Sequence, residues 1–249
     1  MGNKTQYPKP QPVKGLIRQK SLAALFLAIS TGLLIAFANL PSLAIFTNAS
    51  FSASKPHPLP PTLAQWQDQT NSGDYFSQVT PTQVGYLIWS KFPVRVYVET
   101  PKAVNTPQAQ TWVNSVLQAV AEWNNYLPLK VVEQPEIADI KILRKAPPLE
   151  ISPIGNIPRA RSAEARYELY TSSNILCHRF TILLSPSQTG NYIQAAIRHE
   201  LGHALGIWGH SQLQTDALYF SQVRQPPPIS PRDVNTLKRI YEQPTSLGW

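Results

Sequence analysis

The segment that most constrains the fold of this chain runs from residue 199 to residue 210 and reads His-Glu-Leu-Gly-His-Ala-Leu-Gly-Ile-Trp-Gly-His. Apolar residues recur through it and just before it at helical spacing: Ile193, Ile197, Leu201 and Leu205. This periodicity predicts a helix over 191–205 with one apolar face turned inward. On such a helix His199 and His203 lie on one face, where two imidazoles can bind one metal ion beside Glu200.

Gly206 and His210 extend this pattern to a third metal ligand. Glycine suits the left-handed turn that ends a helix, so the chain can bend back and bring His210 to the metal. Three protein ligands with a fourth position left to water are typical of catalytic zinc, whereas structural zinc has four protein ligands, usually including Cys. The only cysteine, Cys177, cannot complete such a cage. The pattern therefore predicts a Zn²⁺ ion bound by His199, His203 and His210.

Glu200 stands next to the first ligand, where its carboxylate can act as a general base. Zinc lowers the pKa of a bound water to about 7, and a neighbouring carboxylate can take the proton of that water. The residues therefore predict a zinc-dependent endopeptidase, in which a zinc-bound water activated by Glu200 hydrolyses peptide bonds. The expected partner is a protein or peptide substrate.

The motif resembles that of the metzincin clan of zinc endopeptidases, and within it the matrixin-like secreted bacterial proteins. The metzincin pattern H-E-x-x-H-x-x-G-x-x-H is matched at four positions: His199, Glu200, His203 and Gly206. The expected third histidine falls on Gly209, and His210 follows one residue later. We expect the extra residue to form a bulge after Gly206, with Gly209 giving the backbone room. The alternatives are a loop histidine that misses the metal, and a catalytically inactive secreted binding domain that keeps the metzincin fold.

The resemblance also implies a turn beneath the metal that carries a methionine, often followed by tyrosine. Leu218 and Tyr219 occupy these two places. Replacing methionine by leucine nearly conserves side-chain volume, so we expect the turn to form. For Tyr219 we prefer a buried ring with a satisfied hydroxyl over a role in the wall of a substrate pocket.

The rest of the pattern predicts an α+β domain. A helix is expected from Thr106 to about residue 123, and strands are expected at 86–90, 94–98, 129–132, 138–143, 165–170 and 180–184. The resemblance implies a metzincin-like zincin fold with a mixed, mostly parallel, five-stranded twisted sheet and two long helices, one of which carries the His-Glu-x-x-His motif. It further implies a small carboxy-terminal subdomain with one helix, which we expect from a capping pattern near Ser230 to about Tyr241.

Two further expectations concern the surroundings of the metal. Prolines between residues 146 and 163 predict a long loop, which in an enzyme often frames a cleft. The resemblance implies that the strand at 165–170 is the edge of the sheet nearest the cleft, where peptide substrates bind by strand addition.

The amino-terminal residues 1–49 predict export. Five basic residues precede a stretch, 21–54, that carries no charge. A basic region followed by an apolar region and small residues is typical of a cleavable signal peptide. An uncleaved anchor is the alternative, because about 20 apolar residues span a bilayer. In both cases the positive residues leave the catalytic domain outside the cytoplasm, either secreted, periplasmic or anchored at the outer face of the membrane.

The export segment also accounts for most of the positive charge. The chain carries a net charge of +8, and residues 1–49 hold five basic and no acidic side chains, which leaves +3 on residues 50–249. This balance gives no support for nucleic-acid binding. Residues 50–82 are rich in Pro, Ser, Gln and Thr and predict an extended linker or short pro-segment before a monomeric catalytic domain, 83–249. Cys177 lies within that domain, so inhibition by a pro-segment cysteine is not expected.

Overall fold

The computed structural model describes residues 53–102, 105–151 and 158–249. The predicted signal peptide or anchor, 1–49, lies outside this range. Contacts between Cα atoms group the residues from Ser50 to Trp249 into one compact unit. Within the described ranges, no helix is both long enough and apolar enough to cross a bilayer.

The centre of the unit is a five-stranded sheet, so the predicted α+β class with a mostly parallel sheet is confirmed. Its strands are β1 Val94–Val98, β2 Leu129–Val132, β3 Ile140–Leu143, β6 Ala163–Ser172 and β7 Ile175–Leu184. They lie in the order β2-β1-β3-β7-β6, with all neighbours parallel except the antiparallel pair of β6 and β7. A separate two-stranded sheet pairs β4 Glu150–Ile151 with β5 Pro158–Arg159.

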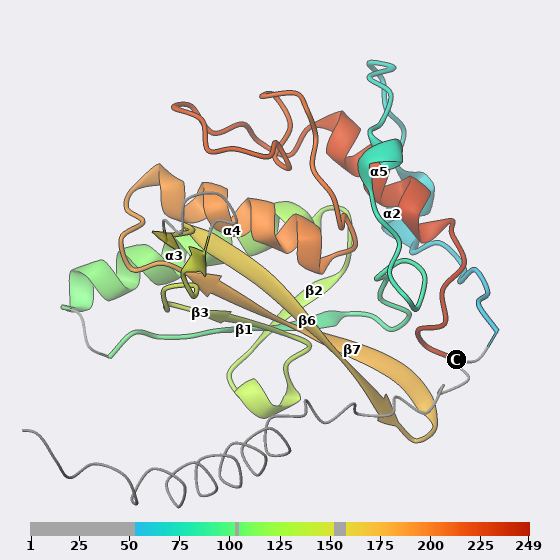
Figure 1. Cartoon of the computed structure of the whole chain (residues 1–249), viewed down its shortest axis with the longest axis horizontal. Coiled ribbons are helices and arrows are strands. Elements are labelled where there is room, and N and C mark those ends of the chain that lie inside the picture. The colour runs from blue at the N-terminus through green and yellow to red at the C-terminus, as the bar shows by residue number, and fades with distance from the viewer. Residues whose placement is uncertain (1–52, 103–104, 152–157) are drawn as a thin grey trace, which may run out of the picture. The chain divides into compact units, whose positions relative to one another are not determined.

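Two long helices lie together on one face of this sheet (Figure 1). The described helices are α2 Pro61–Gln65, α3 Thr106–Asn124, α4 Asn191–Ala204 and α5 Pro231–Tyr241, with short 3₁₀ turns η1 Phe76–Gln78 and η2 Pro135–Ile137. The indole of Trp123 on α3 donates to the carbonyl of Arg198 on α4 over 2.8 Å. The guanidinium of Arg198 in turn pairs with Glu122 at 2.6 Å. These bonds fix α4, the helix that carries the metal-binding motif, against α3.

The segment 86–90 is irregular, so the strand predicted there is wrong. Leu87, Ile88 and Trp89 are buried, but their backbone does not join the sheet. Instead, the Trp89 amide donates to the hydroxyl of Tyr241 over 3.3 Å. Apolar and aromatic residues that partly alternate with polar ones suggested a strand here, whereas side chains from the end of the chain satisfy this backbone.

The β6–β7 hairpin is longer than the sequence predicted. The expected strands at 165–170 and 180–184 extend to ten residues each, joined through Ser173 and Asn174. Both turn residues have positive φ, 50° and 62°, as a two-residue type I′ turn requires. β6 is the outermost strand of the sheet, which confirms the prediction of an edge strand in this position.

Residues 53–82 belong to the compact unit, so the prediction of extended, unpacked backbone over 50–82 is wrong for them. Leu63 and Tyr75 are buried in the core. Lys55 exchanges two backbone hydrogen bonds of 3.0 Å with Thr245. The ring of His57 stacks on that of Trp249, with centroids 4.3 Å apart. Pro, Ser, Gln and Thr make up much of this segment, but the few apolar residues between them are enough to anchor it.

Candidate metal centre

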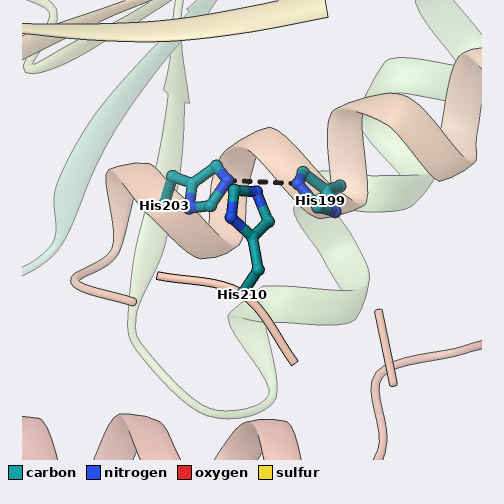
Figure 2. Close-up of side chains that lie close together, drawn as sticks. All are labelled: His199, His203 and His210. Carbon is teal, nitrogen blue, oxygen red and sulfur yellow. Dashed lines mark hydrogen bonds between the residues drawn. The ribbon is translucent and has the colours of Figure 1, made fainter. Parts of the chain in front are cut away.

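Three histidines meet beside α4, and they are the three that the sequence predicted. His199 and His203 project from one face of the helix, and His210 reaches toward them from the chain that follows it (Figure 2). The Nε2 atoms of His199 and His203 are 3.1 Å apart. One nitrogen from each of the three rings lies within 4.8 Å of the other two.

The other ring nitrogen of each helix histidine is held by a backbone carbonyl. His199 Nδ1 lies 2.9 Å from the carbonyl oxygen of Ala217, and His203 Nδ1 lies 2.7 Å from that of Ile207. A carbonyl can only accept, so each Nδ1 carries the proton and each Nε2 presents a lone pair. Such outer partners fix the ring and tautomer of metal-ligating histidines.

Two facing lone pairs at 3.1 Å repel each other unless a cation lies between them. Two Zn–N bonds of about 2.0–2.1 Å at a tetrahedral angle separate the nitrogens by about 3.3–3.4 Å, close to this spacing. The chemistry of the donor set therefore fits a zinc ion. His210 supplies a third imidazole to the same point.

Burial keeps the three imidazoles neutral, which is the form that binds a metal cation. Desolvation lowers the pKa of His199 to about 4 and lowers the pKa of His203 well below its ordinary value. His210 is more exposed, but its pKa is also lowered, first by desolvation and then by the positive charge of Arg161.

The end of α4 explains how the carbonyl of Ile207 comes to face His203. Gly206 has a φ of 134°, and its N–H donates to the carbonyl of His203 over 3.1 Å. The N–H of Ile207 donates to the carbonyl of Gly202 over 3.0 Å. These two bonds are those of a Schellman motif, with glycine at the position that favours positive φ. The predicted helix end at Gly206 is confirmed.

The extra residue before His210 lies in a pair of tight turns. The N–H of Trp208 donates to the carbonyl of Gly206 over 2.8 Å, and the N–H of Gly209 donates to that of Ile207 over 2.9 Å. Each bond closes a three-residue turn, so the chain advances little between Gly206 and His210. The insertion is absorbed in this way, and His210 still reaches the other two rings.

The turn at residues 216–219 lies beneath the helix, where the resemblance placed it. Leu218 is fully buried, and a side-chain carbon at Gly202 would lie only 2.5 Å from its Cδ2 atom. Leu218 therefore fills the space left by Gly202, directly under the motif. Ala217 in the same turn supplies the carbonyl that holds His199.

Tyr219 differs from the preferred expectation of a buried ring with a satisfied hydroxyl. It is half-buried and lines the cleft, and its ring packs against that of Phe220, with centroids 4.5 Å apart and planes tilted by 48°. Within the described ranges, its hydroxyl makes no hydrogen bond. The turn directs this ring outward because the preceding residue, Leu218, takes the inward position.

The carboxylate of Asp233 holds the turn from below. It accepts from the N–H of Ala217 over 2.8 Å, from the Tyr75 hydroxyl over 2.5 Å and from the N–H of Ser230 over 2.8 Å. Burial is the main cause that raises the pKa of Asp233. Ser230 and Asp233 form the capping box that the sequence predicted at the start of α5. Its second role, supporting the turn under the metal, was not predicted.

Asp216 is a further supporting residue that sequence reasoning missed. This buried carboxylate accepts from the Ser211 hydroxyl over 2.5 Å and from Arg232 Nε over 3.0 Å. The N–H of Ser211 also donates to the carbonyl of Leu218 over 2.8 Å. The residue after His210 is thereby tied to the turn beneath the metal. An aspartate before the turn residues was the only local signal for this role.

Glu200 lies at the inner wall of the cleft. Glu200 is 9% exposed. Burial raises the pKa of Glu200 to about 8, whereas the backbone N–H of Ala165 on β6 and the charge of Arg161 act in the opposite direction. A cation bound at the adjacent histidines would further favour the carboxylate.

A cleft of about 1250 Å³ opens at the three histidines. One wall is the start of β6, residues 163–165, together with residues 160–162 of the predicted long loop. The floor is α4, and the opposite wall is formed by residues 219–223. The cleft therefore joins the histidines, Glu200 and the edge strand in one space.

Two other residues considered from the sequence lie away from this cleft. His178 is buried and stacks on Trp89, with ring centroids 3.9 Å apart. Cys177 is half-buried rather than fully buried, with its thiol 3.6 Å from the carbonyl of Ile175.

The sequence was compared with protein-family models and with curated proteins. A scan against protein-family models finds no match for the chain. A search of curated proteins likewise finds no similar sequence. What the site can do is therefore argued from its own residues and their geometry.

Proposed function

We propose that this protein is a zinc-dependent endopeptidase of metzincin type, similar to the matrixins, with His199, His203 and His210 as zinc ligands. The observation that carries the proposal is the 3.1 Å approach of two Nε2 atoms whose partner Nδ1 atoms both donate to carbonyls. A cation between the two Nε2 atoms makes this arrangement favourable. With three protein ligands, one position remains open, as in catalytic zinc sites.

A zinc ion held there would supply a Lewis acid that polarises a carbonyl and lowers the pKa of a bound water. Glu200 acts as the general base: its carboxylate takes a proton from the attacking water as the oxygen bonds to the carbonyl carbon. Glu200 then returns this proton to the amide nitrogen as the C–N bond breaks.

The substrate we propose is an extended peptide. β6 is an edge strand, and its first residues line the cleft, so its free backbone groups are available to pair with a substrate strand. Backbone pairing is independent of side chains and suits an endopeptidase. The aromatic rings of Tyr219 and Phe220, which also line the cleft, would then contact substrate side chains.

We further propose that the enzyme works outside the cytoplasm as a monomer. The location rests on the basic and apolar pattern of residues 1–49, which is typical of an export signal or an anchor. Membrane fractionation of cells that express the radiolabelled full chain tests this. A shortened chain in the soluble fraction indicates a released protein, and a full-length chain in the membrane fraction indicates an anchored one.

The test of the proposed function combines metal content with hydrolysis. We expect the purified protein to hold one equivalent of zinc and to cleave casein or gelatin. Glu200→Ala should abolish cleavage and leave the zinc in place. A wild-type protein that binds zinc without cleaving any protein substrate would instead support a binding domain with the same fold. A metal-free, inert wild-type protein would refute the proposal entirely.

A further inference from the structure

The loop that carries the late histidine is held from outside by a segment far away in sequence. The N–H of Thr80 donates to the carbonyl of Trp208 over 3.0 Å. Val79 and Gly209 form an antiparallel bridge one residue further along. Residues 78–80 thus run beside residues 208–209 in a short ladder that ends directly before His210.

Gly209 shows how closely the two segments approach. A side-chain carbon on Gly209 would lie 2.2 Å from the carbonyl oxygen of Gln78 and 2.9 Å from the Cα of Val79. Both atoms belong to backbone, which cannot move aside as a flexible side chain can. The positive φ that favours glycine is found at Gly206 and not at Gly209. Glycine at position 209 therefore serves the close contact with residues 78–79.

His210 needs such support more than the other two ligands do. His199 and His203 inherit their positions from a helix, whereas His210 follows tight turns and is exposed. On its carboxy-terminal side, Ser211 is tied to the turn at Leu218. On its amino-terminal side, the contact with residues 78–80 supplies the matching anchor. Ordering an irregular loop costs conformational entropy, and two flanking anchors reduce the number of positions available to the ring between them.

We propose that residues 78–80 position His210 for metal binding, so that the segment once expected to be a linker completes the metal centre. The inference rests on the proposed zinc site, since it assigns a role toward that site. The inference goes beyond the proposed zinc site because it assigns residues 78–80 a role in positioning one of the three ligands. Gln78 and Thr80 also line the cleft, so loss of this segment would change its wall as well as weaken metal binding.

The test uses the full chain with two variants that disturb the ladder in different ways. Gly209→Ala introduces a carbon against the Gln78 carbonyl. Thr80→Pro removes the N–H that donates a hydrogen bond to the carbonyl of Trp208. Two matched controls make the same chemical changes nearby without touching residues 208–209. Gly73→Ala strains a positive φ of 74° in the same segment, and Gln83→Pro introduces a proline at the second position of the turn closed by Thr82 and Gly85.

The readouts are the zinc dissociation constant, from chelator competition, and the visible absorption of the Co²⁺ form. This absorption weakens when a four-coordinate site gains an extra water ligand. We expect Gly209→Ala and Thr80→Pro to raise the dissociation constant by about 10–100-fold and to weaken the absorption, as loss of supporting partners does at other metal sites. Both controls should match the wild type, even where their melting temperatures fall.

Two outcomes would overturn the inference, and they are distinguishable. Wild-type affinity and absorption in either ladder variant would refute the positioning role while leaving the zinc site intact. Absence of metal binding in the wild type would refute the proposed zinc site and this inference together. Circular dichroism verifies that each variant is folded, and if one ladder variant does not fold, the other decides.

Discussion

The two parts of the proposed metal centre are built in different ways. His199 and His203 lie on α4, four residues apart, and each is fixed by a carbonyl within 2.9 Å. His210 lies on a loop, is exposed, and depends on anchors at residues 78–80 and 211–218. Local helical geometry thus provides two ligands, and long-range packing provides the third. The helix pair should therefore tolerate changes elsewhere in the chain, whereas the loop ligand should not.

The largest expected effect is on catalysis, and it separates the role of Glu200 in hydrolysis from zinc binding by its neighbours on α4. Glu200→Gln preserves shape but removes the base, so the kcat for peptide hydrolysis should fall by about 10²–10⁴-fold. The zinc dissociation constant should change little, because Glu200 is not one of the three ligands. Parallel measurement of kcat and zinc content checks this prediction. A large loss of zinc would instead show that Glu200 takes part in binding the metal.

A helix ligand should matter more for zinc affinity than the loop ligand. His203→Ala should raise the zinc dissociation constant on the order of 10²–10³-fold, since about 10–16 kcal/mol at a structural site is shared among four ligands. His210→Ala should have a smaller effect, about 10–100-fold, because water can take the place of an exposed imidazole. Chelator competition on both variants tests this order.

His178→Ala is the control for these two substitutions. His178 is buried against Trp89 and away from the cleft, so its loss should lower the melting temperature and leave zinc affinity unchanged. Equal effects of His178→Ala and His210→Ala on zinc affinity would contradict the ligand assignment.

The turn beneath the helix should respond to side-chain volume. Leu218→Ala should destabilise the fold by about 2–5 kcal/mol, because it leaves a cavity under Gly202. Leu218→Met nearly conserves volume and should cost less than about 1.5 kcal/mol. Denaturant unfolding of the two variants provides the measurement. Equal losses would mean that Leu218 does not support the motif by packing.

The smallest expected effect concerns the support of His199 from the amino-terminal segment. Tyr75→Phe removes the hydroxyl that donates to Asp233, whose carboxylate also holds the Ala217 amide. The loss should be about 0.5–1.5 kcal/mol in the free energy of unfolding, the net contribution of one hydrogen bond. Zinc affinity should fall by less than in Gly209→Ala. A larger fall would mean that the helix ligands also depend on distant packing.

The same division separates what the sequence could predict from what it could not. Helical periodicity and one glycine were enough to place α4 and its end at Gly206, and hence two ligands. Local pattern also predicted most of the individual strands, whereas the sheet and its edge strand were implied by the resemblance to metzincins. The contact of Gly209 with Gln78 joins residues far apart in the chain, and no local signal reports it. Composition even pointed the other way, because the prolines of 50–82 suggested an unpacked linker.

Partial alternation of apolar and polar residues misled the prediction at 86–90 as well. These residues resemble a strand, but Tyr241 and Thr245 satisfy the neighbouring backbone from the end of the chain. Tyr219 was expected to be buried with a satisfied hydroxyl, but it is half-buried and lines the cleft.

The most direct test of the account is X-ray absorption at the zinc edge on the purified full chain, together with its zinc content. We predict one zinc per chain, with three imidazole nitrogens at about 2.0–2.1 Å and one further light ligand. In His210→Ala the imidazole count should fall to two. A chain without zinc, or a wild-type spectrum with only two imidazoles that His210→Ala leaves unchanged, would contradict the three-histidine centre.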